Sequence, residues 1–320
     1  MGHKRRDRGP RSDRMSKIVV TGAAGLVGQN LVPKLKARGH QIVAIDKHPA
    51  NTAVLRALHP DITVIEADLS SADGWQEQVA ACEVVISGHA QIGGLDPDAF
   101  QRNNVTATRR LLEAARPDAY LVQMSSSVVE SAANDWYVQT KTEQEQIALN
   151  SGLACAVLRP TLMFGWFDRK HVGWLARFMQ KVPVFPIPGD GRYLRQPLYA
   201  GDFSSVVAAC VDKRAAGVWN ITGLEKIDYI DLMAAVKSAC RAKAPLVKIP
   251  YEAFWLLLKT YALVDKDPPF TVKQLKALVT PDVFEVIDWP GQFGVTATPL
   301  SEALVETFQD PTYAHIVLEF

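Results

Sequence analysis

The sequence predicts an α/β fold built on a doubly wound parallel sheet. Short apolar runs rich in Val and Ile alternate with segments of helical pattern through the first half of the chain. These runs lack the alternation of a strand with one wet face, so helices are expected to cover both faces of the sheet. The predicted strands are residues 17–21, 41–45, 62–66, 83–87, 119–124 and 153–158, and the main predicted helices are 26–38, 100–116 and 135–151.

A change of composition after Arg159-Pro160 predicts a second domain. Residues 161–197 are rich in Pro, Gly and aromatic residues, whereas helix and strand patterns return over residues 198–222. We therefore expect residues 15–160 and 198–222 to form the sheet domain. Residues 161–197 and 223–320 are expected to form a smaller C-terminal α/β domain.

The charges concentrate at the N-terminus and bear on possible partners. Residues 1–14 carry six Lys or Arg and two Asp, a charge of +4, within a chain of net charge +1. The other residues carry 29 basic and 32 acidic side chains, a charge of −3, which gives no sign of nucleic-acid binding. We expect residues 1–14 to be a disordered leader or a cloning remnant, with Met15 as the natural start.

No membrane span and no metal site are expected. No run of about 18 uncharged apolar residues occurs, and the nearest approach, residues 254–264, contains Lys259. The N-terminus lacks the apolar core of a secretory signal. The four cysteines have neither C-x-x-C nor metal-ligand spacing, so they are expected to be reduced core thiols in a cytoplasmic protein. They are Cys82, Cys155, Cys210 and Cys240.

Three glycines stand three residues apart directly after the first predicted strand, in V-T-G-A-A-G-L-V-G at residues 20–28. At such a junction Gly22 permits a tight turn, Gly25 lets the backbone approach a pyrophosphate, and Gly28 lets the helix pack closely on the strand. The helix that begins at Leu26 presents free N–H groups and the positive end of its dipole to the phosphates. The motif therefore predicts a Rossmann-type domain that binds a dinucleotide.

An acidic residue after the second predicted strand bears on which dinucleotide binds. Asp46 can accept hydrogen bonds from the ribose hydroxyls of adenosine and would repel a 2′-phosphate, which favours NAD over NADP. Lys47 and His48 follow it and keep NADP open, and a solvated turn acid is the other interpretation of Asp46. Asp68, after the third strand, suits a cofactor contact or the N-cap of the next helix equally well.

Tyr137 and Lys141 form the most reactive pair that the sequence offers. Their i, i+4 spacing puts both on one face of the predicted helix 135–151. An ammonium near a phenol stabilises the phenolate and lowers the pKa of the Tyr, so Tyr137 could exchange a proton as hydride moves. Residues 125–127 are serines that end the preceding strand, where a hydroxyl could hold the substrate oxygen. By itself the Tyr-Lys spacing is common on helix surfaces, but downstream of a dinucleotide motif it predicts catalysis.

Several motifs together resemble one enzyme family. They are T-G-A-A-G-L-V-G at 21–28, D-L at 68–69, N-V-T-A-T at 104–108, M-S-S-S-V-V at 124–129, Y-V-Q-T-K at 137–141 and R-P-T-L-M-F-G at 159–165. From about Lys17 to Phe308 the chain resembles the extended short-chain dehydrogenase/reductases, and more narrowly the NAD-dependent epimerase/dehydratase family. The resemblance implies an NAD site made by Gly22, Gly25, Leu26, Val27, Gly28, Asp46, Asp68, Leu69, Ser87, Gly88, His89, Asn104, Tyr137, Lys141 and Pro160.

The same resemblance implies roles at the reacting centre. Tyr137 would be the catalytic acid/base, and Lys141 would bind the nicotinamide ribose and tune the Tyr. Ser126 falls at the position of the catalytic Ser, with Ser127 as its competitor, because Glu130 stands where the family has the Tyr of a V-Y-G signature.

Two further expectations come from the family. Asn104 would support the helix-to-strand contacts near the site. Family members commonly dimerise through the helices that bear the Asn104 and Tyr137 motifs, so a homodimer is expected.

Substrate recognition is less well determined by the sequence. In P-G-D-G-R-Y-L-R-Q-P at 188–197, Arg195, and second to it Arg192, would meet the diphosphate of a nucleotide sugar, since the guanidinium fork suits phosphate. Two departures weaken this hypothesis. Tyr137 follows Ser126 by only eleven positions, and W-P-G-Q at 289–292 stands where sugar epimerases have R-P-G-D. Solvated loop charges are the other interpretation of both arginines.

Three functions stay open at this point. Ser127-Val128 stand where 4,6-dehydratases have Asp-Glu, and the Glu of decarboxylating relatives is missing too, so neither reaction is expected. The first hypothesis is a nucleotide-sugar epimerase that retains and recycles NAD. The second is a dehydrogenase or reductase of a hydroxysteroid-like or other apolar alcohol, for which residues 250–270 supply apolar surface unless they form a packed core helix. The third is a non-catalytic regulator that binds NAD or NADP.

Overall fold

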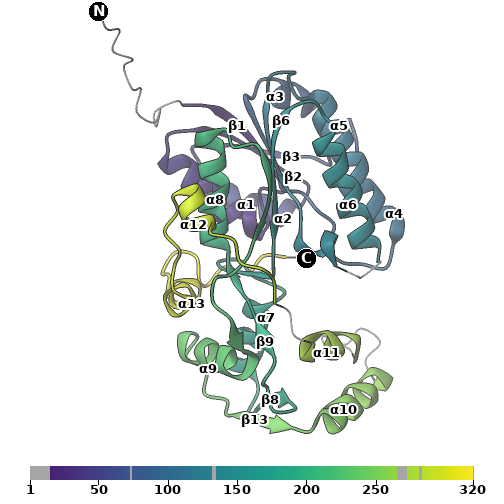
Figure 1. Cartoon of the computed structure of the whole chain (residues 1–320), viewed down its shortest axis with the longest axis vertical. Helices are drawn as coiled ribbons and strands as arrows, with labels where there is room; N and C mark the ends of the chain where they lie inside the picture. Colours follow the sequence, from purple (N-terminus) through teal and green to yellow (C-terminus); the bar gives the residue numbers. More distant parts are fainter. Residues whose placement is uncertain (1–14, 73, 132–134, 265–271, 281–282, 320) are drawn as a thin grey trace, which may run out of the picture. The chain divides into compact units, whose positions relative to one another are not determined.

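The chain divides into two compact units, which are described here one at a time. The structure is a computed structural model that describes residues 15–72, 74–131, 135–264, 272–280 and 283–319 (Figure 1). The first unit comprises the described residues up to Pro160, together with Gly201–Asn220 and Asp288–Thr296. The second unit comprises Thr161–Ala200, Ile221–Ile287 and Ala297–Phe320. The predicted leader, residues 1–14, lies outside the described part of the chain.

A seven-stranded sheet forms the centre of the first unit and confirms the predicted doubly wound parallel fold. Its strand order is β11-β6-β5-β4-β1-β2-β3, and the pairings from β6 through to β3 are all parallel. The order reverses direction beside β1, so the carboxyl ends of β1 and β4 flank the point where such sheets bind ligands. The strands are β1 Lys17–Thr21, β2 Gln41–Asp46, β3 Thr63–Glu66, β4 Val84–Ser87, β5 Tyr120–Met124, β6 Ala154–Pro160 and β11 Gly217–Ile221.

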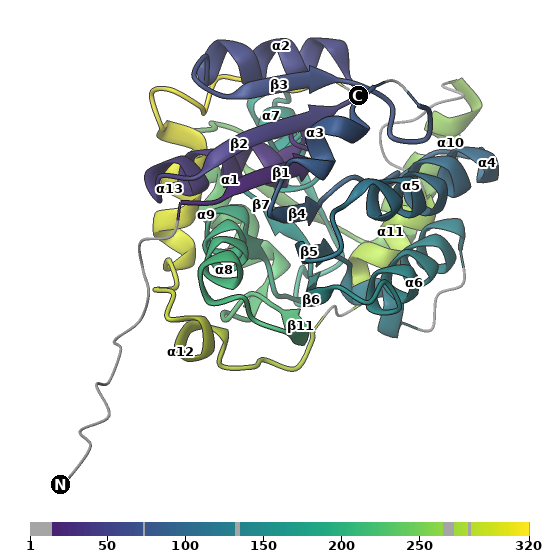
Figure 2. The same cartoon turned by 90° about the horizontal axis from the view of Figure 1, so that it is seen from above.

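Helices cover both faces of this sheet, as its uniformly apolar strands require. Figure 2 shows α1 (Leu26–Ala37) and α8 (Ala200–Lys213) on one face, with α5 (Ala107–Ala114) and α6 (Trp136–Leu149) on the other. Central strand residues such as Val19, Val85 and Leu121 have no exposed surface. The helices α2 (Pro49–Leu58) and α3 (Gln76–Ala80) complete the layers.

The predicted helix 100–116 is interrupted in the structure. α4 (Pro97–Phe100) is followed by a π-helical segment, Gln101–Thr106, before α5 begins. A π-helix widens the turn and changes the direction in which its side chains point, and such segments often occur at functional sites. Periodicity alone did not reveal it, because a single widened turn hardly alters the apolar pattern.

The W-P-G-Q segment corrects the predicted domain boundary. The sequence assigned residues 288–296 to the second domain, but they belong to the first unit. In α12 (Trp289–Phe293), the ring of Phe293 packs edge-on against Trp219 with centroids 5.3 Å apart. Lys213 Nζ also donates a hydrogen bond of 3.3 Å to the carbonyl of Gln292.

The second unit is a smaller α/β assembly of short strand pairs and helices. β7 (Met163–Phe164) pairs with β10 (Leu198–Tyr199), β8 (Phe185–Pro188) with β13 (Leu246–Ile249), and β9 (Leu194–Arg195) with β12 (Ile227–Asp228). Its helices are α7 Val172–Lys181, α9 Tyr229–Ala239, α10 Tyr251–Val264, α11 Val272–Val279 and α13 Leu300–Gln309. Met179, Met233 and Ala303 lie fully buried in its core. None of the helices in the described ranges is long and apolar enough to span a membrane.

The three glycines of the β1–α1 loop meet different surroundings. Gly22 has φ +64°, and a Cβ there would lie 2.6 Å from the carbonyl oxygen of Gly88. A Cβ at Gly28 would lie 2.4 Å from the carbonyl oxygen of Ala23. A Cβ at Gly25 would meet only the carbonyl oxygen of Gly22, at 3.4 Å. Folding therefore requires glycine at positions 22 and 28, whereas position 25 has room for a methyl group.

This difference gives a test of the loop. Gly28→Ala should destabilise the protein by about 2–3 kcal/mol in urea unfolding, because helix α1 must move away from the loop. Gly25→Ala is the matched control. Its free energy of unfolding should lie within ~0.5 kcal/mol of the native value, while its affinity for NADH should be lower. Equal stabilities for the two variants would contradict the packing argument.

Candidate active site

The β1–α1 loop fits the pyrophosphate of a dinucleotide. Gly25 is the N-cap of α1, and no side chain caps the first N–H groups of that helix in the described structure. The open space beside Gly25 leaves the backbone accessible at the positive end of the helix dipole. Leu26, Val27 and Gly28 form the first turn, so the residues predicted for this role lie together.

Asp46 holds this loop in place. Its Oδ2 accepts a hydrogen bond of 3.0 Å from the N–H of Ala24, and its Oδ1 accepts one of 3.1 Å from the N–H of His48. A carboxylate has about four lone-pair sites, so Asp46 keeps acceptor capacity for ribose hydroxyls. The interpretation of Asp46 as a merely solvated turn acid is therefore wrong.

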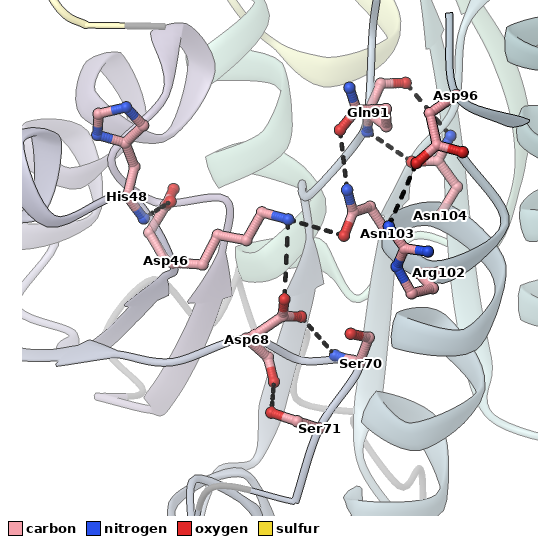
Figure 3. A network of polar contacts seen from close by, with 11 residues as sticks. Asp46, His48, Asp68, Ser70, Ser71, Gln91, Asp96, Arg102, Asn103 and Asn104 are labelled. Carbon is pink, nitrogen blue, oxygen red and sulfur yellow. Dashed lines mark hydrogen bonds and ion pairs between the residues drawn. The ribbon is translucent and has the colours of Figure 1, made fainter. Parts of the chain in front are cut away.

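Asp68 belongs to a polar network at the carboxyl edge of the sheet (Figure 3). Its Oδ1 accepts a hydrogen bond of 2.8 Å from the N–H of Ser70, and its Oδ2 lies 3.8 Å from Nζ of Lys47. Although burial acts to raise its pKa, the hydrogen bonds from Ser70 and the charge of Lys47 hold the pKa of Asp68 below its ordinary value. The N-cap interpretation is wrong, since α3 begins at Gln76 with Trp75 as its N-cap. Leu69 is buried beside Asp68.

The π-helical segment joins this edge to helix α6. Asn103 Oδ1 accepts a hydrogen bond of 2.7 Å from Lys47 Nζ. Asn104 Oδ1 accepts one of 2.6 Å from the N–H of Gln91 (Figure 3). Its Nδ2 donates one of 2.9 Å to Oγ1 of Thr140 on α6. Asn104 thus ties the segment after β4 to the helix that carries Tyr137.

Ser126 and Tyr137 meet at the carboxyl end of β5. Ser126 precedes a short 3-10 helix, Ser127–Glu130, and its Oγ accepts a 3.4 Å hydrogen bond from the N–H of Val128. A side-chain hydrogen bond links Ser126 to Tyr137. Asp135 begins α6 by accepting a hydrogen bond of 3.0 Å from the N–H of Val138, and so sets the position of Tyr137.

The pKa of Tyr137 does not follow the expectation from the sequence. Burial raises it above the ordinary value of a Tyr, and the hydrogen bond from Ser126 lowers it only in part. The expected lowering by Lys141 is wrong for this structure because the ammonium is held by other acceptors. Lys141 Nζ donates a hydrogen bond of 2.7 Å to the carbonyl of Met124 and another to Oε1 of Gln144.

Lys141 is almost completely buried. Only 2% of the residue is exposed, and burial lowers its pKa to about 7, while the nearby carboxylate of Glu145 acts to raise it. Both protonation states are therefore accessible near neutral pH. The described residues provide acceptors for two of its three N–H donors, and the third could serve a ribose hydroxyl.

A buried ion pair that sequence reasoning missed supports the serine loop. Arg159 on β6 contacts the carboxylates of Glu145 and Glu130, and Ser125 Oγ donates to Glu145. Although burial acts to raise the pKa of Glu145, Arg159 and Ser125 hold it below its ordinary value. Asn220 donates a hydrogen bond of 2.9 Å to Glu130. The i+4 spacing of Glu145 from Lys141 was the available signal.

The other predicted cofactor residues line the ends of β4 and β6. Ser87 ends β4 with no exposed surface, and Gly88 packs where a Cβ would lie 2.8 Å from the carbonyl oxygen of Thr21. His89 is buried just beyond, and Pro160 ends β6.

The two arginines predicted to bind a diphosphate already have partners in the second unit. Arg192 Nη1 contacts Asp228 at 2.9 Å and Asp231 at 2.8 Å. Arg195 is 7% exposed, donates a hydrogen bond of 2.8 Å to the carbonyl of Thr280, and lies 5.4 Å from the ring centre of Tyr193. Neither guanidinium is an unengaged loop charge. Ser127, the third residue predicted to contact substrate, is buried in the first unit.

The amino-acid sequence is similar to those of known proteins. A sequence model described as the NAD dependent epimerase/dehydratase family matches residues 18–222. The chain is 25% identical over 272 residues to the 3 beta-hydroxysteroid dehydrogenase/Delta 5-->4-isomerase of Mycobacterium tuberculosis, covering 73% of this chain and 72% of that protein. It is 27% identical over 324 residues to the 2-alkyl-3-oxoalkanoate reductase of Stenotrophomonas maltophilia, covering 87% of this chain and 94% of that protein.

A solved structure shares the fold. UDP-glucuronic acid 4-epimerase from Bacillus cereus, in complex with NAD, matches with a TM-score of 0.66 at 21% identity, covering 91% of this chain and 94% of that chain. The family match spans the glycine loop, the Ser126 loop and the Tyr137–Lys141 pair. The protein belongs to the NAD dependent epimerase/dehydratase family and is therefore an NAD-dependent oxidoreductase or epimerase.

Proposed function

We propose that the protein interconverts a secondary alcohol and a ketone on a largely apolar substrate, with NAD as the redox partner. The observation that carries the chemistry is the hydrogen bond between Ser126 and Tyr137, with the buried Lys141 one helical turn after Tyr137 on α6. The observation that carries the substrate class is that Arg192 and Arg195 already have partners.

Residues of the chain itself transfer the proton and position the groups that react. When bound, the nicotinamide supplies the acceptor or donor of a hydride. In reduction, the protonated phenol of Tyr137 gives its proton to the substrate oxygen as the carbon gains hydride, and in oxidation the phenolate form of Tyr137 takes the hydroxyl proton as the carbon loses hydride. Ser126 Oγ holds the substrate oxygen beside Tyr137. Lys141 holds a ribose hydroxyl through the N–H bond that is not given to Met124 or Gln144.

NAD is favoured over NADP by the position of Asp46. Its carboxylate is anchored at the start of the phosphate loop by the N–H groups of Ala24 and His48. A negative charge fixed there would oppose a 2′-phosphate on the adenosine ribose. Lys47 does not offset this charge freely, because its ammonium contacts Asn103 and Asp68.

An apolar substrate is supported by three observations. The carboxylates of Asp228 and Asp231 offset the positive charge of Arg192 that a diphosphate would need. In α10, Leu256 and Leu257 are each more than half exposed, as an apolar binding segment would be. The hydroxysteroid and 2-alkyl-3-oxoalkanoate named for two relatives are mostly hydrocarbon. Part of the predicted apolar segment 250–270, residues 265–270, lies outside the described residues.

Nucleotide-sugar epimerisation with retained NAD is the second candidate. The same Ser-Tyr-Lys arrangement could oxidise a sugar carbinol and reduce it again on the other face. A UDP-sugar epimerase has the same fold, which supports this candidate at the level of architecture. The homodimer and the cytoplasmic location expected from the sequence stay predictions, as does the alternative of a non-catalytic regulator.

Removing the phenol oxygen tests the catalytic assignment. Tyr137→Phe should lower kcat by about 10²–10⁴-fold, because a general acid/base is lost, while the Kd for NADH changes by less than about twofold. Kinetics and fluorescence titration measure the two quantities. Retained turnover would contradict the assignment, and an inactive native chain that binds NADH would favour the regulator.

A substrate panel separates the two enzymatic candidates. The purified protein is incubated with UDP-, GDP- and dTDP-sugars without added cofactor, and with apolar ketones plus NADH. We expect ketone reduction and no sugar isomers by NMR. Arg192→Ala and Arg195→Lys should leave the KM for the ketone within about twofold, since neither is expected to contact it. New sugar isomers, with a raised KM in both variants, would establish the epimerase instead.

The carboxylate of Asp46 can be tested through cofactor preference. Asp46→Asn keeps an acceptor oxygen but removes the charge, and should reduce the ratio of NAD to NADP affinity by about tenfold or more. The melting temperature serves as the control for the loop contact with Ala24. An unchanged preference in a folded variant would remove Asp46 from this role.

A further inference from the structure

We propose that Gln144 is a positioning residue for Lys141, and that Thr108 and His89 fix the orientation in which its amide acts. This inference rests on the proposed function, in which Lys141 contacts the nicotinamide ribose. All four side chains belong to the first unit. Gln144 and Thr108 have no exposed surface, and His89 is 9% exposed.

The hydroxyl of Thr108 sets the direction of every hydrogen bond in the cluster. Its Oγ1 donates its single proton to the carbonyl of Asn104, over 2.7 Å. It must therefore accept from both of its other neighbours, Gln144 Nε2 at 2.8 Å and His89 Nε2 at 3.0 Å.

The amide of Gln144 then has only one possible orientation. Its nitrogen faces the Thr108 oxygen, so its Oε1 faces the ammonium of Lys141 and accepts a hydrogen bond from it. The reverse orientation would bring an NH₂ group against the ammonium and leave two buried groups unsatisfied. Gln144 therefore presents an acceptor to Lys141 at all times.

The imidazole of His89 keeps this arrangement independent of pH. With Nε2 as the donor to Thr108, Nδ1 accepts from Thr21 Oγ1 at 2.8 Å, a shorter contact than the 3.3 Å from the same hydroxyl to the carbonyl of Ile86. Burial, assisted by the charge of Lys141, lowers the pKa of His89 to about 3, so the ring stays neutral over the working range of the protein. The chain of contacts runs from Thr21, at the start of the phosphate loop, to Lys141.

Lys141 consequently has two fixed acceptors, one from the backbone of β5 and one from Gln144. The charged group that acts on Lys141 is Glu145 on its own helix, whose carboxylate is paired with Arg159. The other titratable neighbour, His89 after β4, is neutral. Fixing two of the three N–H bonds of an ammonium fixes the direction of the third. That third bond is the one available for a ribose hydroxyl.

Two substitutions of Gln144 should act in opposite directions. NADH affinity is expected to fall as pH rises and Lys141 loses its proton, and the pH at half of this loss is the midpoint. Gln144→Glu places a negative charge beside the ammonium and should raise the midpoint by about one pH unit or more. Gln144→Leu removes the acceptor, and should weaken NADH binding about tenfold at neutral pH and shift that midpoint to lower pH. Fluorescence titration of NADH against pH, on the full chain, measures both.

Thr108 provides the test of orientation. Thr108→Val removes the shorter hydrogen bond of the Gln144 amide nitrogen and leaves only the 3.4 Å bond to the carbonyl of His89. It should shift the midpoint in the same direction as Gln144→Leu, with a smaller loss of affinity, about threefold. Thr108→Ser keeps the hydroxyl, so it should keep the native midpoint and an NADH affinity within about twofold of the native value. The matched control is Thr52→Val, a buried helical threonine on α2 that does not contact this cluster. It should leave the midpoint unchanged.

The outcomes distinguish this inference from the proposed function. If the Glu and Leu variants shift the midpoint in the same direction, or no further than Thr52→Val, Gln144 has a structural role only. If the native chain binds no NADH, the proposed function fails, and the titration of Lys141 is followed instead through the pH dependence of unfolding.

That second measurement needs no cofactor. A Lys whose pKa is lowered by folding from 10.5 to about 7 makes the native state more stable as pH rises between those values. Gln144→Glu should narrow the pH range over which the free energy of unfolding rises, relative to the native chain. Lys141→Met should abolish that rise. A pH range of unchanged width in Gln144→Glu would overturn the inference.

Discussion

The placement of one ammonium group out of contact with water constrains the whole catalytic face of the first unit. Transferring a charged Lys into the interior is costly unless hydrogen bonds replace its hydration. Here the carbonyl of Met124 and the amide oxygen of Gln144 do so, and Glu145 supplies a countercharge nearby. Each of these partners needs its own support. β5 must end at Met124, α6 must lie against it, and Arg159 must hold Glu145.

The architecture was predictable because its signals are local. The strands were found from their apolar runs, and the boundaries agree with the structure to within one or two residues. The glycine loop was found because Gly22 and Gly28 meet backbone atoms that only a glycine can approach so closely. The proximity of Ser126 to Tyr137 followed from strand end and helix start. Each of these depends on residues close together in the sequence, or on rules of parallel sheets.

What the sequence did not show depends on distant partners. The fixed amide of Gln144 requires Thr108, 36 residues earlier, and the chemistry of either residue alone suggests nothing. The direction of the Tyr137 pKa depends on how deeply the ring is buried and on where Lys141 points. The arginines illustrate the same limit. The partners of Arg192 and Arg195, which are Asp228, Asp231 and Thr280, lie 36 or more residues away and could not be predicted from the local sequence.

The late segment around α12 has a consequence for how the protein is made. Residues 288–296 complete the first unit, and the chain passes through the second unit before it reaches them. The surface that Phe293 covers on Trp219 is therefore open until residues 288–296 have left the ribosome. Each unit is built from segments on both sides of the other. A nascent chain that stalls before α12 would expose this apolar surface to chaperones and proteases.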